Sequence, residues 1–217
     1  MDNTEIFSLI TNIKGYEKSL NHDSLEKSKK NNDKPFQKYE FLGDRVLGLI
    51  IAEYLIKKFQ KDNLDEISRR FIHLVNTNTL SKIFKKFEIN EIFKHQLDPN
   101  SNKNSVYADA LESLIGFIYT NKGLDFTRNI VLNLWQEELD TLPQKDPKTF
   151  IQEYSQRKNK KIPSYKLIKE SGTKHKPEFI ISLKIDHFSV EGEGVSKQKA
   201  EIAAAKKMIK LIFDKQF

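Results

Sequence analysis

The sequence of 217 residues contains no cysteine. Disulfide bonds and thiolate metal ligands are thereby excluded, so we expect no disulfide-linked partner. Residues 1–20 lack the basic and apolar regions of a secretory signal, and no apolar run approaches the roughly 20 residues of a membrane span. We therefore expect a cytoplasmic protein that has no membrane partner.

An excess of positive charge is absent from the first two thirds of the chain. Residues 1–145 hold 21 Lys and Arg against 21 Asp and Glu, whereas residues 146–217 hold 16 against 9. This distribution favours a neutral body joined to a basic, phosphate-binding module, and a basic tail that aids solubility is the alternative. The length allows one large domain or two modest ones.

Two acids stand at the start of an apolar helical stretch. The residues from Val46 to Leu55 are nearly all apolar or small, which predicts a helix buried on most sides. Glu40 and Asp44 are four residues apart, on the helical face that continues through Leu47 and Ile51. We therefore expect both carboxylates at the edge of the core. An ordinary solvated acidic face is the alternative.

A second apolar stretch, Tyr107 to Tyr119, also carries two acids on one helical face. Asp109 and Glu112 are its only charged residues. A desolvated carboxylate is costly unless it is paired, protonated or bound to metal, and the stretch contains no Lys or Arg. Two such pairs facing each other would form an oxygen-lined cation site, which suits Mg²⁺ or Mn²⁺ better than zinc.

Three motifs resemble those of one known family. The segment Glu40-Phe-Leu-Gly-Asp44-Arg-Val-Leu resembles the signature helix of ribonuclease III. The segment from Ala108 to Tyr119 resembles that family's second acidic helix. The upstream Leu-Thr-His-x-Ser motif is similar to Leu20-Asn-His-Asp-Ser24. The C-terminal residues resemble the double-stranded RNA-binding domain of bacterial members, so the resemblance covers essentially the whole chain.

The resemblance implies a multi-domain protein. An all-α ribonuclease III catalytic domain is expected over 1–142, a linker over 143–147, and an α+β (α-β-β-β-α) double-stranded RNA-binding domain over 148–217. The residue pattern supports a linker at this place, because the polar segment from Thr141 to Pro147 contains two prolines. The pattern after it then predicts a helix, three strands and a helix: 147–158, 165–170, 179–185, a strand at Val190, and a helix ending near Phe213.

Helical periodicity organises the first domain. It predicts helix, turn and helix over 5–30, a helical run from Ile67 to Phe87, and a closing helix from Phe126 to Leu139 whose Trp135 lies in the core. Five side chains of the middle run are expected core contacts: Leu74, Leu80, Ile83, Phe84 and Phe87.

The dipeptide His22-Asp23 has a competing interpretation. It also occurs in helical phosphohydrolases, where it supplies metal ligands. That fold needs further His and Asp ligands, and the scattered His residues of this chain form no convincing set. We expect His22 and Ser24 to pack or cap beside the signature helix instead.

The resemblance implies a metal-dependent endoribonuclease that cuts double-stranded RNA in rRNA and mRNA processing, leaving 5′-phosphate and 3′-hydroxyl ends. Glu40, Asp44, Asp109 and Glu112 would bind Mg²⁺, which Mn²⁺ could replace, and Asp44 and Glu112 would be the catalytic pair. Activated water would attack the phosphate, so no side-chain nucleophile is needed. One or two ions per site are both compatible with four carboxylates. A homodimer is also implied, in which each subunit cuts one strand.

Some positions depart from the family pattern. The family's fifth, auxiliary acid aligns with Leu64, and the adjacent Asp65 is our candidate for that role. Gln37 stands where an acid is common near the dimer seam, and Lys38 and Arg45 also differ. These departures bear on the details of dimer formation.

By resemblance, six residues are expected to contact duplex RNA: Gln152, Glu153, His175, Ser196, Lys197 and Lys199. The first two should face one minor groove and the histidine the next, while the last three hold the phosphates between them at a helix N-terminus. Gln198 interrupts the adjacent lysines of the family, and Gly172-Thr-Lys-His175 lacks its usual proline.

A non-catalytic binder of duplex RNA, which keeps the fold as a scaffold, is the second hypothesis. Such proteins are expected to lose metal ligands, whereas all four acids are present here. Recognition of RNA by shape leaves little trace in residue types, so the sequence points to no particular transcript.

Overall fold

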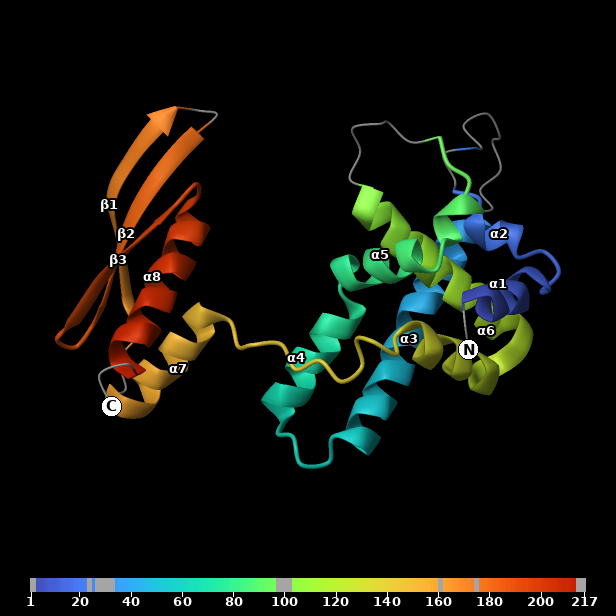
Figure 1. The fold of residues 1–217 in the computed structure, drawn as a ribbon, viewed down its shortest axis with the longest axis horizontal. Helices are drawn as coiled ribbons and strands as arrows, with labels where there is room; N and C mark the ends of the chain where they lie inside the picture. The colour runs from blue at the N-terminus through green and yellow to red at the C-terminus, as the bar shows by residue number, and fades with distance from the viewer. Residues whose placement is uncertain are drawn as a thin grey trace. The chain divides into compact units, whose positions relative to one another are not determined.

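The computed structural model describes six stretches of the chain: residues 3–22, 25, 34–96, 103–159, 162–173 and 176–213. The chain divides into two compact units, Met1–Pro143 and Gln144–Phe217 (Figure 1). In the described part of the chain, no helix has the length and apolar character that crossing a membrane requires.

The described part of the first unit is helical, as predicted. Its elements in chain order are α1 (Asn3–Thr11), α2 (Glu17–Leu20), α3 (Pro35–Lys58), α4 (Leu64–Val75), α5 (Thr77–Lys86), the 3₁₀ helix η2 (Ile89–Glu91) and α6 (Lys103–Leu134). The helix α3 runs through the middle of this unit beside α6, with which it makes its most extensive packing (Figure 1).

The helix α3 is buried on one side and exposed on another. Leu47, Ile51 and Leu55 lie in the core, as their spacing indicates. Phe41 and Ile56, however, are exposed. Both lie outside Val46–Leu55, the stretch for which burial on most sides was predicted, and within that stretch only Leu49 is exposed, so the prediction is confirmed there. At Phe41 and Ile56 no other element of the described chain covers α3.

The helices α4 and α5 begin at side-chain caps. Asn63 and Glu66 form a reciprocal capping box at α4, and the Asn76 side chain accepts a hydrogen bond from the Thr79 backbone N–H at α5. The cap at Asn76 divides the predicted run into two helices. The five expected core contacts are all buried, which confirms that prediction: Leu74, Leu80, Ile83, Phe84 and Phe87.

The helix α6 bends at Gly123, whose φ of +76° and ψ of 179° are accessible to glycine and strained for other residues. The predicted closing helix is the part beyond this bend, and it ends earlier than predicted, at Leu134. Trp135 follows and is fully buried, as expected. Its Nε1–H donates to the Leu74 carbonyl at 2.8 Å, so the end of the unit is tied to α4.

The second unit has the predicted order of helix, three strands and helix. Its elements are α7 (Pro147–Asn159), β1 (Ser164–Thr173), β2 (Lys176–Ile185), β3 (Phe188–Gly194) and α8 (Lys197–Phe213). The strands form one antiparallel sheet in the order β1-β2-β3. The helix side of the sheet carries a small core around Ile151, Leu183 and Met208.

Candidate metal centre and RNA-binding module

The acids of the first unit stand where two helix backbones touch. A Cβ atom on Gly43 of α3 would lie 1.8 Å from the Glu112 carbonyl oxygen. One on Gly116 of α6 would lie 2.0 Å from the Tyr39 carbonyl oxygen. Only glycine fits at either position, and this contact places Glu40 beside Glu112. The signal for these glycines in the sequence is their spacing from the acids, since Gly43 follows Glu40 by three positions and Gly116 follows Glu112 by four, but this spacing alone does not predict the contact.

Three of the four predicted metal ligands converge at this crossing. One carboxylate oxygen from each of Glu40, Asp109 and Glu112 lies within 4.8 Å of the others. All three side chains are half-buried. Among the described residues this group contains no histidine, so its donors are the hard oxygen ligands that Mg²⁺, Mn²⁺ and Ca²⁺ prefer.

The electrostatics of the cluster favour a bound cation. Burial is the main cause that raises the pKa of the Glu112 carboxyl to about 8. Three negative charges act in the same direction, in falling order Asp44, Asp109 and Glu40. Burial also raises the pKa of Asp109, against the opposing charge of His22. A divalent cation would relieve this repulsion, so the residues present fit a metal ion.

The fourth predicted ligand, Asp44, lies at the edge of the cluster. Its side chain is 51% exposed and forms an ion pair with the neighbouring Arg45. The Arg45 guanidinium also lies over the Phe41 ring, 4.1 Å from its centre. Asp44 is close enough to be the leading charge acting on Glu112, but its oxygens are not among those that converge.

Two further candidates lie outside the cluster. His22 packs edge-on against Phe36, with 5.1 Å between ring centres, and its backbone N–H donates to the Lys94 carbonyl. These contacts agree with a packing role, whereas Ser24 lies outside the described residues. Asp65, on the first turn of α4, pairs with Arg69 at 3.2 Å and is not among the converging acids.

The predicted RNA-contact residues of α7 differ in their surroundings. Gln152 is exposed. The Glu153 carboxylate is held by Lys145 Nζ, 2.7 Å and 2.8 Å from its two oxygens, and by Arg157 at 3.4 Å. The Glu153 carboxylate therefore already has partners within the protein when no RNA is bound.

The start of α8 brings together the three predicted phosphate contacts. The Ser196 hydroxyl oxygen accepts the Lys199 backbone N–H at 3.2 Å, and Lys199 itself is exposed. Lys197 Nζ lies 3.6 Å from a Glu170 carboxylate oxygen. Gly194 permits this position, because a Cβ atom there would lie 2.5 Å from the Ala200 nitrogen. His175 lies outside the described residues.

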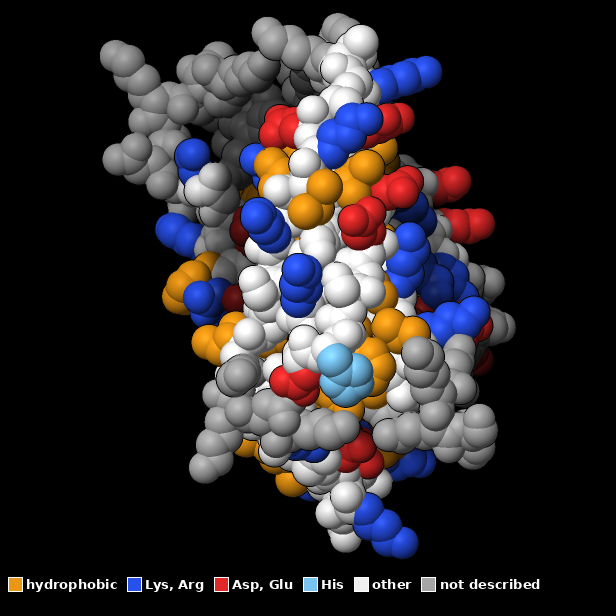
Figure 2. Space-filling model, turned by 90° about the vertical axis from the view of Figure 1, so that its left-hand side faces the viewer, with side chains coloured by type: hydrophobic (Ala, Val, Ile, Leu, Met, Phe, Trp, Pro, Cys, Tyr) orange, Lys and Arg blue, Asp and Glu red, His pale blue; other side chains and the backbone are white. Residues whose placement is uncertain are grey.

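Positive charge is not uniform over this unit. On the face that Figure 2 shows, Lys and Arg side chains are interspersed with Asp and Glu side chains. The net excess of basic residues therefore does not make every face equally suited to phosphate. A helix N-terminus with two lysines combines a dipole and formal charge, which is the stronger local arrangement for a phosphate.

Comparisons with known proteins agree with both units. The family model described as Ribonuclease-III-like matches residues 12–139, and the double-stranded RNA binding motif matches residues 147–212. The curated Ribonuclease 3 of Pelagibacter ubique is 40% identical over 205 residues, which cover 91% of this chain and 90% of that protein. The Ribonuclease 3 of Nitratiruptor sp. is 38% identical over 204 residues, or 89% and 88% of the two chains.

A solved structure shows the same relation for the first unit. The nuclease domain of ribonuclease III from Campylobacter jejuni matches with a TM-score of 0.53 and 30% identity, covering 66% of this chain and 100% of that one. A helical nuclease domain followed by a double-stranded RNA-binding domain defines a class of endoribonucleases. The chain belongs to the ribonuclease III family.

Proposed function

We propose that this endoribonuclease hydrolyses phosphodiester bonds of double-stranded RNA at the acidic cluster between α3 and α6. The observation that carries the proposal is the convergence of Glu40, Asp109 and Glu112 in a half-buried site whose own charges repel one another. Mg²⁺, replaceable by Mn²⁺, would supply an activated water and neutralise phosphate charge. The products are 5′-phosphate and 3′-hydroxyl ends.

We assign the catalytic roles to Asp44 and Glu112. Glu112 is half-buried, its pKa is raised to about 8, and it loses its proton when a cation is bound, because metal ligands must be deprotonated. Asp44 lies one turn along α3 from Glu40, at the exposed edge where a phosphate can approach. The ion pair between Asp44 and Arg45 must break before the Asp44 carboxylate can reach a metal ion.

The second unit is proposed to bind the duplex by shape. Gln152 and Glu153 would accept or donate hydrogen bonds in one minor groove, and His175 would enter the next. Ser196, Lys197 and Lys199 would hold the phosphates between them. We take the linker as 143–147 and the two domains as 1–142 and 148–217, with processing of rRNA and mRNA in the cytoplasm as the cellular role.

We propose that the enzyme acts as a homodimer. The exposed apolar side of α3, with Phe41 and Ile56, adjoins an apolar recess against α4 that includes Ile67 and Ile72. A surface of this kind is typical of a protein–protein interface. The nuclease domain of ribonuclease III from Campylobacter jejuni has a region involved in dimer formation, which supports the proposal of a homodimer here.

The function is tested by incubating the protein with long duplex RNA and Mg²⁺. We expect cleavage to require Mg²⁺, to stop with EDTA, and to fall at least 100-fold in Glu112→Gln. The matched control is Glu137→Gln, which removes an exposed carboxylate paired with Lys86 and should cleave normally. Cleavage that survives both EDTA and Glu112→Gln would overturn the metal mechanism, whereas binding without cleavage would favour the scaffold hypothesis.

A further inference from the structure

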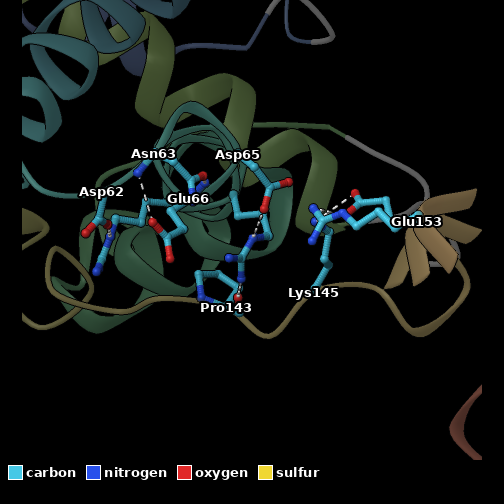
Figure 3. Close-up of polar contacts among 10 residues, drawn as sticks. Asp62, Asn63, Asp65, Glu66, Pro143, Lys145 and Glu153 are labelled. Carbon is cyan, nitrogen blue, oxygen red and sulfur yellow. Dashed lines mark hydrogen bonds and ion pairs between the residues drawn. The ribbon is translucent and has the colours of Figure 1, made fainter. Parts of the chain in front are cut away.

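The segment that joins the two units is anchored to the first of them up to Pro143. Arg69 of α4 donates from Nη1 to the Pro143 carbonyl at 2.5 Å. Arg70, the next residue, donates from Nη1 to the Asp140 carbonyl at 2.9 Å. Figure 3 labels both partners of Arg69, the Asp65 carboxylate and the Pro143 carbonyl. Residues up to Pro143 are therefore held on the nuclease unit.

The same segment is anchored to the second unit from Lys145 onward. The Lys145 side chain reaches along α7 to Glu153, eight residues later, and Figure 3 shows the two side chains pointing toward each other. The Asp146 carboxylate accepts the backbone N–H groups of Lys148 and Thr149, both at 3.0 Å. Because Asp146 also precedes Pro147, its backbone is restricted to extended conformations.

Between these anchors lies Gln144, which is exposed. Within the described chain it makes neither a hydrogen bond nor an ion pair. Gln144 therefore has two backbone dihedrals that no such contact restrains, and this pivot lies between a residue held on the first unit and one whose side chain is held on the second. The Lys145 side chain is only 18% exposed, and that of Glu153 is 35% exposed. The pair is thus partly shielded from water.

We propose that Lys145 is a latch on the linker: its ion pair with Glu153 restrains the linker. Duplex RNA releases this restraint by forming hydrogen bonds to the Glu153 carboxylate in place of Lys145. The proposal rests on the RNA contact proposed above for Glu153. Both Glu153 oxygens are engaged by Lys145, so a 2′-hydroxyl that donates to this carboxylate competes directly with the linker. The released ammonium then has RNA phosphates as alternative partners, and Lys145 joins Gln144 in the pivot.

The strength of the pair suits a latch. Ion pairs of this kind favour the paired state by roughly a few-fold, which is enough to populate it and weak enough for RNA to reverse. Lys145 is therefore a positioning residue: it limits the movement of the RNA-binding unit before RNA is bound. It has no contact with the acidic cluster among the described interactions.

The latch can be tested in the full-length chain with a single spin label. Because the sequence has no cysteine, Gln144→Cys provides a unique site for a nitroxide. In EDTA, without RNA, we expect a restricted spectrum, and a mobile fraction that rises at least twofold in Lys145→Gln and in Glu153→Gln. The matched control is Arg157→Gln, which removes the other partner of Glu153 without touching the linker and should leave the spectrum unchanged.

Addition of an RNA duplex of about 20 base pairs, longer than the roughly 16 that such a domain spans, tests the release. The mobile fraction of the otherwise unchanged chain should rise to that of Lys145→Gln, and Lys145→Gln should not change further. Equal spectra for the two chains without RNA, or a gel-shifted complex whose label stays restricted, would overturn the proposal. Failure to bind the duplex would remove the proposed RNA contact and the release step with it, while the RNA-free spectra still decide whether Lys145 holds the linker.

Discussion

Glu112 is the residue on which the chemistry of the cluster depends. Its pKa of about 8 means that, without a cation, the carboxyl holds a proton at neutral pH. Metal ion and proton therefore compete for the same oxygens. This competition explains how a half-buried site with four acids nearby can exist in the metal-free protein.

The first prediction follows from that shift. Because the folded state raises the pKa of Glu112 above its unfolded value near 4.5, the folded chain binds more protons between that value and about 8. The contribution of this group to stability is thus fully present below about pH 4.5 and is lost as the pH rises to about 8. In EDTA, the melting temperature should fall between pH 5 and pH 8.

The neutral isostere provides the control for this prediction. Glu112→Gln cannot ionise, so its melting temperature should vary less over the same range and should exceed that of the unchanged chain at pH 8. Added Mg²⁺ should stabilise the unchanged chain at pH 8 and leave Glu112→Gln largely unaffected. If the melting temperatures of the two chains changed by the same amount over this pH range, the raised pKa would not belong to Glu112.

The second prediction concerns Gly43. In Gly43→Ala the new methyl group would stand 1.8 Å from the Glu112 carbonyl oxygen, so α3 and α6 must separate. We expect a loss of about 3 kcal/mol in the free energy of unfolding, together with loss of Mg²⁺ binding. Gly48→Ala on the same helix is the control, because its methyl group would meet Phe71 at an ordinary 3.7 Å.

Gly48→Ala should be neutral or should stabilise the protein by up to about 1 kcal/mol, as replacement of a helical glycine usually does. Urea unfolding of both variants gives the comparison. If Gly43→Ala unfolded at the same urea concentration as Gly48→Ala, the close approach of the two backbones would be refuted.

Among the elements, α4 holds the end of the first unit through a buried ion pair. The Arg70 guanidinium donates from Nε to Asp62 at 2.8 Å and lies 3.7 Å from the centre of the Phe59 ring. Its side chain is only 8% exposed. Together with its bond to the Asp140 carbonyl, this arginine joins the two ends of the α3–α4 connection to the segment after α6.

The third prediction follows from this burial. Arg70→Ala leaves the Asp62 carboxylate without its partner and removes a packed side chain, so we expect a loss of about 3 kcal/mol in the free energy of unfolding. Lys57→Ala is the control, because the Lys57 side chain is 73% exposed and its pair with Glu53 should contribute far less to the free energy of unfolding. Thermal unfolding of both variants measures the difference, and equal losses would show that burial of Arg70 does not matter.

The sequence predicted most elements because their signals are local. Helical spacing identified the core side chains of α5, and alternation with Gly and Pro identified the strands of the second unit. The shared faces of Glu40 with Asp44 and of Asp109 with Glu112 depend on spacing along one helix. The division of one predicted run into α4 and α5 at Asn76 was missed, although this Asn is itself a capping signal.

The spacing of residues along one helix does not predict how two helices pack against each other. The approach of α3 to α6 depends on Gly43 meeting a backbone atom of a distant residue, and no periodicity records such a contact. The turning of Asp44 toward Arg45 is likewise a choice among side-chain rotamers. The pairing of Glu153 with Lys145 joins the linker to a predicted RNA contact, and the motif alone gave no sign of it.

For the molecule as a whole, charge is divided between the two units. Residues 1–145 are balanced, with 21 basic and 21 acidic residues, so long-range attraction to RNA must come from the remaining residues, which hold 16 and 9. A tethered RNA-binding unit raises the local concentration of duplex near the acidic cluster without adding any contact to that cluster. Affinity and chemistry should therefore be separable.

The last prediction tests that separation through the salt dependence of RNA binding in EDTA. Each lost phosphate contact lowers the slope of log affinity against log salt by roughly 0.7 to 0.9. Lys197→Gln combined with Lys199→Gln should therefore lower it by roughly 1.4 to 1.8, and a chain ending at Pro143 should lower it further. Glu112→Gln, which alters only the cluster, should keep the full slope because it removes no phosphate contact. If the chain ending at Pro143 kept the full slope, the nuclease unit would itself supply the phosphate contacts, and the balanced charge of that unit would hide a local basic surface.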